Sequence, residues 1–151
     1  MTELRKAELR RRVVEVARSW LGTPYHHHAR IKGQGVDCAQ ILAAVYEEAG
    51  IVEHIDLGDY ARQWHLHQSD ELYLQWLEKC GAWRISTAPQ PGDIGVWKFG
   101  HTHSHGGIVI EGGDDPLILH SYIKARRGVT LCRASENPLA GAEASQYWSI
   151  I

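Results

Sequence analysis

Hydrophobic positions recur with helical spacing in the first half of the chain. Near the N-terminus they repeat every three or four residues, with Thr2 before them as a capping residue and Gly22 after them. The apolar positions of this predicted helix are Leu4, Leu9, Val13, Val16, Trp20 and Leu21. The pattern predicts a second helix over residues 38–49 and a third that begins at 69–71 and ends before Gly81.

Beyond Pro89 the pattern changes to short apolar runs separated by glycine, aspartate and proline, which is typical of strands. The predicted strands cover residues 93–99, 107–111, 117–122, 128–132 and 146–151. Helices followed by strands indicate an α+β fold with an antiparallel sheet rather than alternating strands and helices. A length of 151 residues suits a single domain over 1–151.

Composition and charge narrow the class of protein. The chain carries 16 Lys+Arg against 18 Asp+Glu, and this balance argues against a nucleic-acid-binding protein. No apolar run approaches the ~18 residues of a membrane span. The basic N-terminal segment lacks the apolar core and cleavage site of a secretory signal, so we expect synthesis in the cytoplasm without membrane insertion. With 3 cysteines, at least one thiol is free; the 10 histidines need a further explanation.

Cys38 is the first candidate for chemistry, because it follows a glycine-rich turn and opens the second predicted helix. A thiol in that position lies at the positive end of the helix dipole, which favours the thiolate. The alternative is a buried structural cysteine. That interpretation suits Cys80, at the apolar end of a helix, and Cys132, in a strand.

A thiolate nucleophile needs a histidine as base and a third group to orient that base. His105 stands just before an apolar strand, beside two glycines that leave room for access. His120 ends the next apolar run, and a hairpin through residues 111–115 could bring the two side chains together. Spacing alone is therefore compatible with a Cys–His–His arrangement.

The other histidines suggest a metal at first sight. If 101–105 were a strand, His101, His103 and His105 would share one face and could chelate zinc. No HExxH or CxxC spacing accompanies them, so we expect no metal and no cofactor, and a zinc-binding module stays open as an alternative. We interpret 101–103 as a loop at the rim of a cleft and 26–28 as a polar loop near Tyr25.

Five short motifs follow one another in the order found in the NlpC-type peptidoglycan peptidases, a family of papain-like cysteine peptidases. They are WLGTPY at 20–25, GVDC at 35–38, PGDI at 91–94, SHGGIVI at 104–110 and LHS at 119–121. Each motif is weak alone, but together they span most of the chain in the right order. The sequence therefore resembles this family.

The resemblance implies a papain-like NlpC-type fold, in which N-terminal helices pack on a five- to six-stranded antiparallel sheet. It implies that Cys38 is the nucleophile, His105 the base and His120 the group that orients the base. Tyr25 matches a family tyrosine whose hydroxyl lies near the thiol and helps to bind the oxyanion. Asp37 is expected either to cap the helix or to receive a substrate amine.

The sequence departs from the common Asp-Cys-Ser-Gly motif of the family, because Ala39 and Gln40 follow the cysteine. This change puts the family's contacts with the amino end of the substrate in question. Further substrate contacts are expected from Trp64 and His103. The remaining candidates for the groove wall are His65, His67 and Trp76.

Residues 37–50 are most similar to a phage-tail branch of the family, whose members are small single domains encoded among tail genes or in gene-transfer particles. The resemblance implies cleavage of peptidoglycan stem peptides at the bond between γ-D-glutamate and the diamino acid. It also implies assembly with other tail proteins into a phage-like particle. A non-catalytic tail assembly protein with the same fold stays open, as does an amidase or acyltransferase on another substrate.

Overall fold

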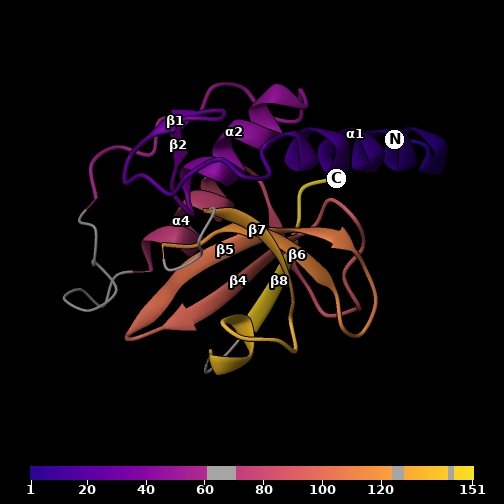
Figure 1. The fold of residues 1–151 in the computed structure, drawn as a ribbon. Coiled ribbons are helices and arrows are strands. Elements are labelled where there is room, and N and C mark those ends of the chain that lie inside the picture. The colour runs from indigo at the N-terminus through magenta and orange to yellow at the C-terminus, as the bar shows by residue number, and fades with distance from the viewer. Residues whose placement is uncertain (61–70, 124–127, 143–144) are drawn as a thin grey trace.

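The computed structural model describes residues 1–60, 71–123, 128–142 and 145–151 (Figure 1). These residues contain three α-helices: α1 (Glu3–Ser19), α2 (Gln40–Glu48) and α4 (Leu72–Lys79). Six strands form an antiparallel sheet in the order β3-β8-β4-β5-β6-β7. Their bounds are β3 (Trp83–Ile85), β4 (Ile94–Phe99), β5 (Thr102–Glu111), β6 (Leu117–Ser121), β7 (Val129–Arg133) and β8 (Ser145–Ser149). The predicted α+β fold, with helices packed on a six-stranded antiparallel sheet, is confirmed.

Two short elements complete the described part of the chain. A two-stranded hairpin of β1 (Arg30–Ile31) and β2 (Gly35–Val36) precedes α2, and a 3-10 helix, η1 (Leu139–Gly141), precedes β8. Helices α1 and α2 lie together along one side of the sheet, with the two chain termini on that side (Figure 1). In the described residues, no helix is long and apolar enough to cross a membrane.

Helix α1 has the predicted start, but not all of its apolar positions are buried. The Thr2 hydroxyl accepts the Arg5 N–H at 3.1 Å, as expected of a capping residue. Leu9 and Val13 are buried against the sheet. Leu4, however, is 83% exposed, because the first turn of the helix extends beyond the sheet (Figure 1). Helical spacing alone does not show where the underlying sheet ends, so it does not identify which apolar positions are buried.

Helix α2 is the buried helix of the fold. Every side chain from Gln40 to Tyr46 is buried. The helix begins two residues later than predicted and ends at Glu48, and Gly50 follows its C-cap with a left-handed φ of 76°. Helix α4 begins at Leu72; the predicted start signal at 69–70 lies outside the described residues.

The sheet differs from the prediction at two places. Strand β3 was not predicted, because three residues carry too little pattern to recognise. Strand β5 begins at Thr102 rather than at 107, so the expected loop over 101–103 is wrong for Thr102 and His103. Pairing with β4 extends this strand: Phe99 pairs with Thr102, and a shift of register leaves Ser104 as a bulged residue.

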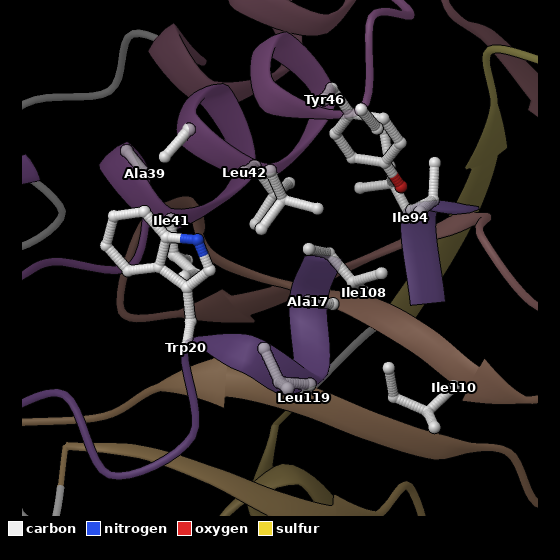
Figure 2. Close-up of a cluster of buried hydrophobic side chains, with 14 of the residues drawn as sticks. Ala17, Trp20, Ala39, Ile41, Leu42, Tyr46, Ile94, Ile108, Ile110 and Leu119 are labelled. Carbon is white, nitrogen blue, oxygen red and sulfur yellow. The ribbon is translucent and has the colours of Figure 1, made fainter. Parts of the chain in front are cut away.

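Two hydrophobic clusters pack on the two faces of the sheet. The larger lies between the sheet and the helices; Figure 2 shows Ala17 and Trp20 gathered with α2 side chains over Ile108 and Leu119. The smaller consists of Trp97, Val109, Ile118, Cys132 and Leu139, with η1 contributing the last of these. Both clusters use alternate residues of β5 and β6, as expected for central strands.

A buried ion pair attaches the helices to the start of β4. Arg10 on α1 donates to Asp93 Oδ1 at 2.7 Å and to the Pro91 carbonyl at 3.0 Å. The Tyr46 hydroxyl on α2 donates to the Gly92 carbonyl at 2.7 Å. These contacts hold both helices against the sheet, so the N-terminal end of α2 has a defined position over β5.

The strands β5 and β6 separate near that end of α2. Their ladder covers Ile108–Glu111 of β5, whereas His105 pairs only with β4, and His120 only with β7. The segment before α2 approaches this region, since the Ser121 hydroxyl donates to the Val36 carbonyl at 2.7 Å. The turn that carries Cys38 is thereby brought to the two strands that carry the candidate histidines.

Candidate active site

The two candidate histidines are in direct contact. His105 Nε2 and His120 Nδ1 are 2.7 Å apart, which is a hydrogen bond between the rings. His105 is 7% exposed and His120 is 0% exposed. Burial lowers the pKa of His120 from its ordinary 6.5 to about 4, so this ring is neutral at pH 7. The pairing that the motif order implied is therefore present in the structure.

The thiol of Cys38 lies beside the β5 backbone next to His105. Its Sγ donates to the Ser104 carbonyl at 3.5 Å. The N–H groups of Cys38 itself and of Gly106 lower the thiol pKa by hydrogen bonding. Cys38 and His105 are thus on neighbouring segments. The sulfur contacts the backbone of Ser104 and Gly106, the residues on either side of His105 in β5.

The resting charge of Cys38 differs from the expectation. Burial raises the pKa of the thiol above its ordinary value, and the charge of Asp37 raises it further. The prediction that the helix dipole sets the pKa of Cys38 is wrong. Helix α2 starts only at Gln40, and the Asp37 carboxylate already occupies its N-terminus. Cys38 therefore rests as a thiol and needs a base to ionise it.

The hydrogen bond between the rings sets the proton positions that catalysis would need. If His105 donates through Nε2–H, its Nδ1 is free of a proton and can act as a base. His120 must then accept at Nδ1 and carry its own proton on Nε2. In the described residues this buried Nε2 has no hydrogen-bond partner. His120 can therefore orient His105 and stabilise its protonated form by hydrogen bonding rather than by charge.

Two aromatic residues that the sequence did not single out frame the histidines. The Phe99 ring lies 5.6 Å from that of His105, edge to face. The Tyr122 ring stacks on His120 at 5.8 Å and also contacts His105 at 5.8 Å. Strand alternation could have pointed to Tyr122, because residues two apart lie on the same face. These rings restrict the rotation of both imidazoles.

The glycines that follow His105 serve packing rather than access. A Cβ on Gly106 would lie 2.1 Å from the Tyr73 hydroxyl, and one on Gly107 would lie 2.4 Å from the Ile118 side chain. The Tyr73 hydroxyl donates to the Cys38 carbonyl at 2.8 Å. The absence of a side chain at Gly106 thus lets α4 reach the turn that carries the thiol. The expectation that the two glycines leave room for access beside His105 is therefore wrong.

Asp37 caps α2, which is one of the two roles predicted for it. Oδ1 accepts the N–H groups of Ala39 and Gln40 at 3.0 and 2.8 Å. Oδ2 accepts the His28 N–H at 2.8 Å and the Tyr60 hydroxyl at 2.5 Å. The residue is 1% exposed, so neither oxygen faces solvent where a substrate amine would arrive.

The remaining predicted residues are in varied surroundings. Tyr25 is half-buried and forms an isolated β-bridge with Val36, two residues before Cys38. The backbone N–H and ring Nδ1 of His103 both contact Glu71 Oε2, at 2.9 and 3.2 Å, which turns this side chain toward α4.

The expected groove wall is described only in part. Trp64, with His65 and His67, lies outside the described residues. Trp76 on α4 packs against Tyr60 and Tyr73.

The histidines are not arranged as a metal site in the part of the chain that the structure describes, where no three His, Cys, Asp or Glu residues could hold an ion. The bulge at Ser104 interrupts the alternation that would have placed His103 and His105 on one face. His27 and His28 instead contact the Tyr60 carbonyl.

Comparison with solved structures identifies the fold. No protein-family model matches the sequence, and no curated protein matches it. The NlpC/p60 domain of the peptidoglycan hydrolase SagA is similar over 92% of this chain and 96% of that chain, with a TM-score of 0.58 and 18% identity. A Staphylococcus aureus protein described as similar to a lipoprotein of the NLP/P60 family is similar over 92% of this chain and 41% of that chain, with a TM-score of 0.57 and 18% identity. The chain has the papain-like α+β fold of NlpC/P60 domains.

Proposed function

We propose that this protein is a cysteine peptidase that cleaves peptidoglycan stem peptides. The observation that carries the proposal is the buried His105–His120 hydrogen bond beside the thiol of Cys38. A cysteine, a histidine and a group that orients the histidine are the parts that thiol-based acyl transfer requires. Wall peptides are the proposed substrate because SagA, a structural neighbour, is described as a peptidoglycan hydrolase.

The proposed reaction begins with proton transfer from the Cys38 thiol to His105. The sulfur attacks the amide carbonyl, and protonated His105 donates its proton to the departing amine. Water, activated by neutral His105, then hydrolyses the thioester and restores the thiol. His120 accepts the Nε2–H of His105 throughout, so the base keeps the tautomer that faces the thiol.

The developing oxyanion needs donors near the sulfur. The backbone N–H of Cys38 is one candidate, and the Tyr25 hydroxyl is the second that the family resemblance implies. For the bond cleaved we propose the link between γ-D-glutamate and the diamino acid, on the same resemblance. The proposed peptidase occupies the single domain predicted over 1–151.

Purified cell walls provide the test. The wild-type protein should lower the turbidity of a wall suspension and release new amino groups, whereas Cys38→Ala and His105→Ala should do neither. Cys80→Ala is the matched control, since it removes the thiol of the C-cap residue of α4 and should keep activity. Circular dichroism of each variant establishes that the fold is retained. Wall hydrolysis by folded Cys38→Ala would refute the mechanism.

We also propose that the protein assembles into a phage-like particle. The support is the similarity of residues 37–50 to the phage-tail branch of the family. Mass spectrometry of particles purified from the source cells should then detect this chain together with tail proteins. Its consistent absence from purified particles would overturn this proposal without affecting the proposed activity.

A fold-retaining, non-catalytic tail protein is the second candidate. The raised pKa of the Cys38 thiol favours it, because an unreactive buried thiol suits a structural role. The rates of thiol alkylation separate the two. A peptidase requires Cys38 to react faster than Cys80 and Cys132 at neutral pH, whereas a structural protein does not.

A further inference from the structure

Tyr60 makes a side-chain contact next to the nucleophile, although no motif includes it. It lies in the irregular segment between α2 and α4, and its hydroxyl donates to Asp37 Oδ2 at 2.5 Å. Asp37 directly precedes Cys38 and is almost fully buried. A residue 23 positions along the chain is thus connected to the turn that presents the thiol.

The Asp37 carboxylate has opposing effects on its neighbour. It holds the turn by capping α2, yet its negative charge disfavours a thiolate at Cys38. A hydrogen-bond donor on Oδ2 draws negative charge away from the sulfur and also satisfies a buried carboxylate. The donors there are the His28 N–H and the Tyr60 hydroxyl, and His27 Nδ1 lies farther away at 3.9 Å.

His27 and His28 hold Tyr60 in this position. The His28 ring stacks on the Tyr60 ring, with centroids 4.1 Å apart and planes at 24°. The Nε2 atoms of His27 and His28 lie 3.1 and 2.9 Å from the Tyr60 carbonyl oxygen. Trp76 also packs edge-on against Tyr60, with ring centroids 5.3 Å apart. His28 adopts a left-handed φ of 65°, a conformation that costs energy outside glycine and supports a specific purpose for this loop.

We propose that Tyr60 is a positioning residue for the nucleophile: through its hydrogen bond to Asp37 it fixes the turn that presents Cys38 and reduces the effect of the carboxylate charge on the sulfur. The clustered histidines at 27 and 28 anchor Tyr60 for this task. The inference rests on the proposed function in one respect, namely that Cys38 is the reacting group.

The groups near Cys38 come from five segments. Asp37 lies in the same turn as Cys38. Its Oδ2 accepts hydrogen bonds from Tyr60 and from His28 of the 26–28 loop. Tyr73 approaches from α4 and His105 from β5. Tyr60 and Tyr73 are neutral, because burial and the nearby Asp37 raise the pKa of both phenols. Tyr60→Phe therefore removes one hydrogen bond to Asp37 and leaves the other charges in place.

The pH dependence of Cys38 alkylation tests the proposal. Iodoacetamide is added over a range of pH, and peptide mass spectrometry reports the rate at each cysteine separately. Tyr60→Phe should lower the Cys38 rate about three- to tenfold at each pH below the midpoint of the thiol, which corresponds to an upward shift of the profile by about half a unit to one unit. Tyr147→Phe is the matched control, because Tyr147 on β8 packs with the smaller cluster on the other face of the sheet, and this variant should leave the profile unchanged.

A second arm asks whether the effect passes through Asp37. In an Asp37→Asn background the carboxylate charge is gone, so adding Tyr60→Phe should produce no further shift. An unchanged profile in Tyr60→Phe alone would overturn the proposal, as would an equal shift with and without the carboxylate. If wild-type Cys38 reacts no faster than Cys80, the proposed function fails. The Tyr60 proposal is decided separately by the difference between variant and wild type.

Discussion

Acidification should destabilise this protein through His120. The ring is fully buried on β6, with Nδ1 bonded to His105 and its pKa lowered to about 4. In the unfolded chain the same imidazole titrates near 6.5. Between these two values the unfolded state binds a proton that the folded state does not. The stability contribution is therefore complete above about pH 6.5 and is lost as the pH falls toward 4.

The size of the effect follows from the two pKa values. A difference of one bound proton changes the free energy of unfolding by about 1.4 kcal/mol per pH unit. Over the range from 6.5 to about 4 this amounts to about 3 kcal/mol, a large part of the stability of a typical domain. His120→Gln cannot titrate, although its amide oxygen can still accept a hydrogen bond from His105. Its unfolding free energy should therefore fall less steeply over this range.

Urea unfolding followed by tryptophan fluorescence measures this directly at pH values from 4 to 7.5. The control is His101→Gln, since His101 is exposed in the turn between β4 and β5. It should show the same pH dependence as wild type. Parallel curves for wild type and His120→Gln would show that His120 does not stay neutral in the folded state, and would refute the reasoning.

Three further predictions concern the packing that places the site. Asp93→Asn should lower the unfolding free energy by about 3–5 kcal/mol, because it leaves Arg10 unpaired in a buried position. Arg11→Ala removes an exposed pair with Glu15 and should lower it by under about 1 kcal/mol. Equal losses in the two variants would contradict the importance of burial. Gly106→Ala should cost about 1–3 kcal/mol and slow Cys38 alkylation, because its Cβ would displace Tyr73, whereas Gly141→Ala, with its nearest neighbour at 3.9 Å, should change little. If both glycine variants unfold at the same urea concentration as wild type, the close contact with Tyr73 is wrong. Thr2→Ala should lower the unfolding free energy by about 1 kcal/mol, measured in the same assay, and no change would mean that the cap is frayed in solution.

The candidate site residues could be singled out from the sequence because each stands in a locally distinctive pattern. Cys38 follows a glycine-rich turn before an apolar helix, His105 precedes an apolar run, and His120 ends the next apolar run. The cap at Asp37 follows from the same local logic, since aspartate before a helix accepts its first N–H groups. The hairpin that carries the two histidines could be predicted from the two neighbouring apolar runs and the turn between them.

The features that were missed depend on contacts between distant parts of the chain. Tyr60 lies in a segment without periodicity, and nothing local indicates that it reaches Asp37. The raised pKa of Cys38 depends on burial by elements that fold over it, which the helix dipole alone does not describe. The early start of β5 depends on pairing with β4, which outweighs the polar character of 101–104.

The most direct test of the central claim is mass spectrometry of the fragments released from purified peptidoglycan by wild type and by Cys38→Ala. The account predicts that wild type releases peptides cut between D-glutamate and the diamino acid, and that folded Cys38→Ala releases none. Release of the same peptides by Cys38→Ala, or of fragments cut only in the glycan, would contradict it.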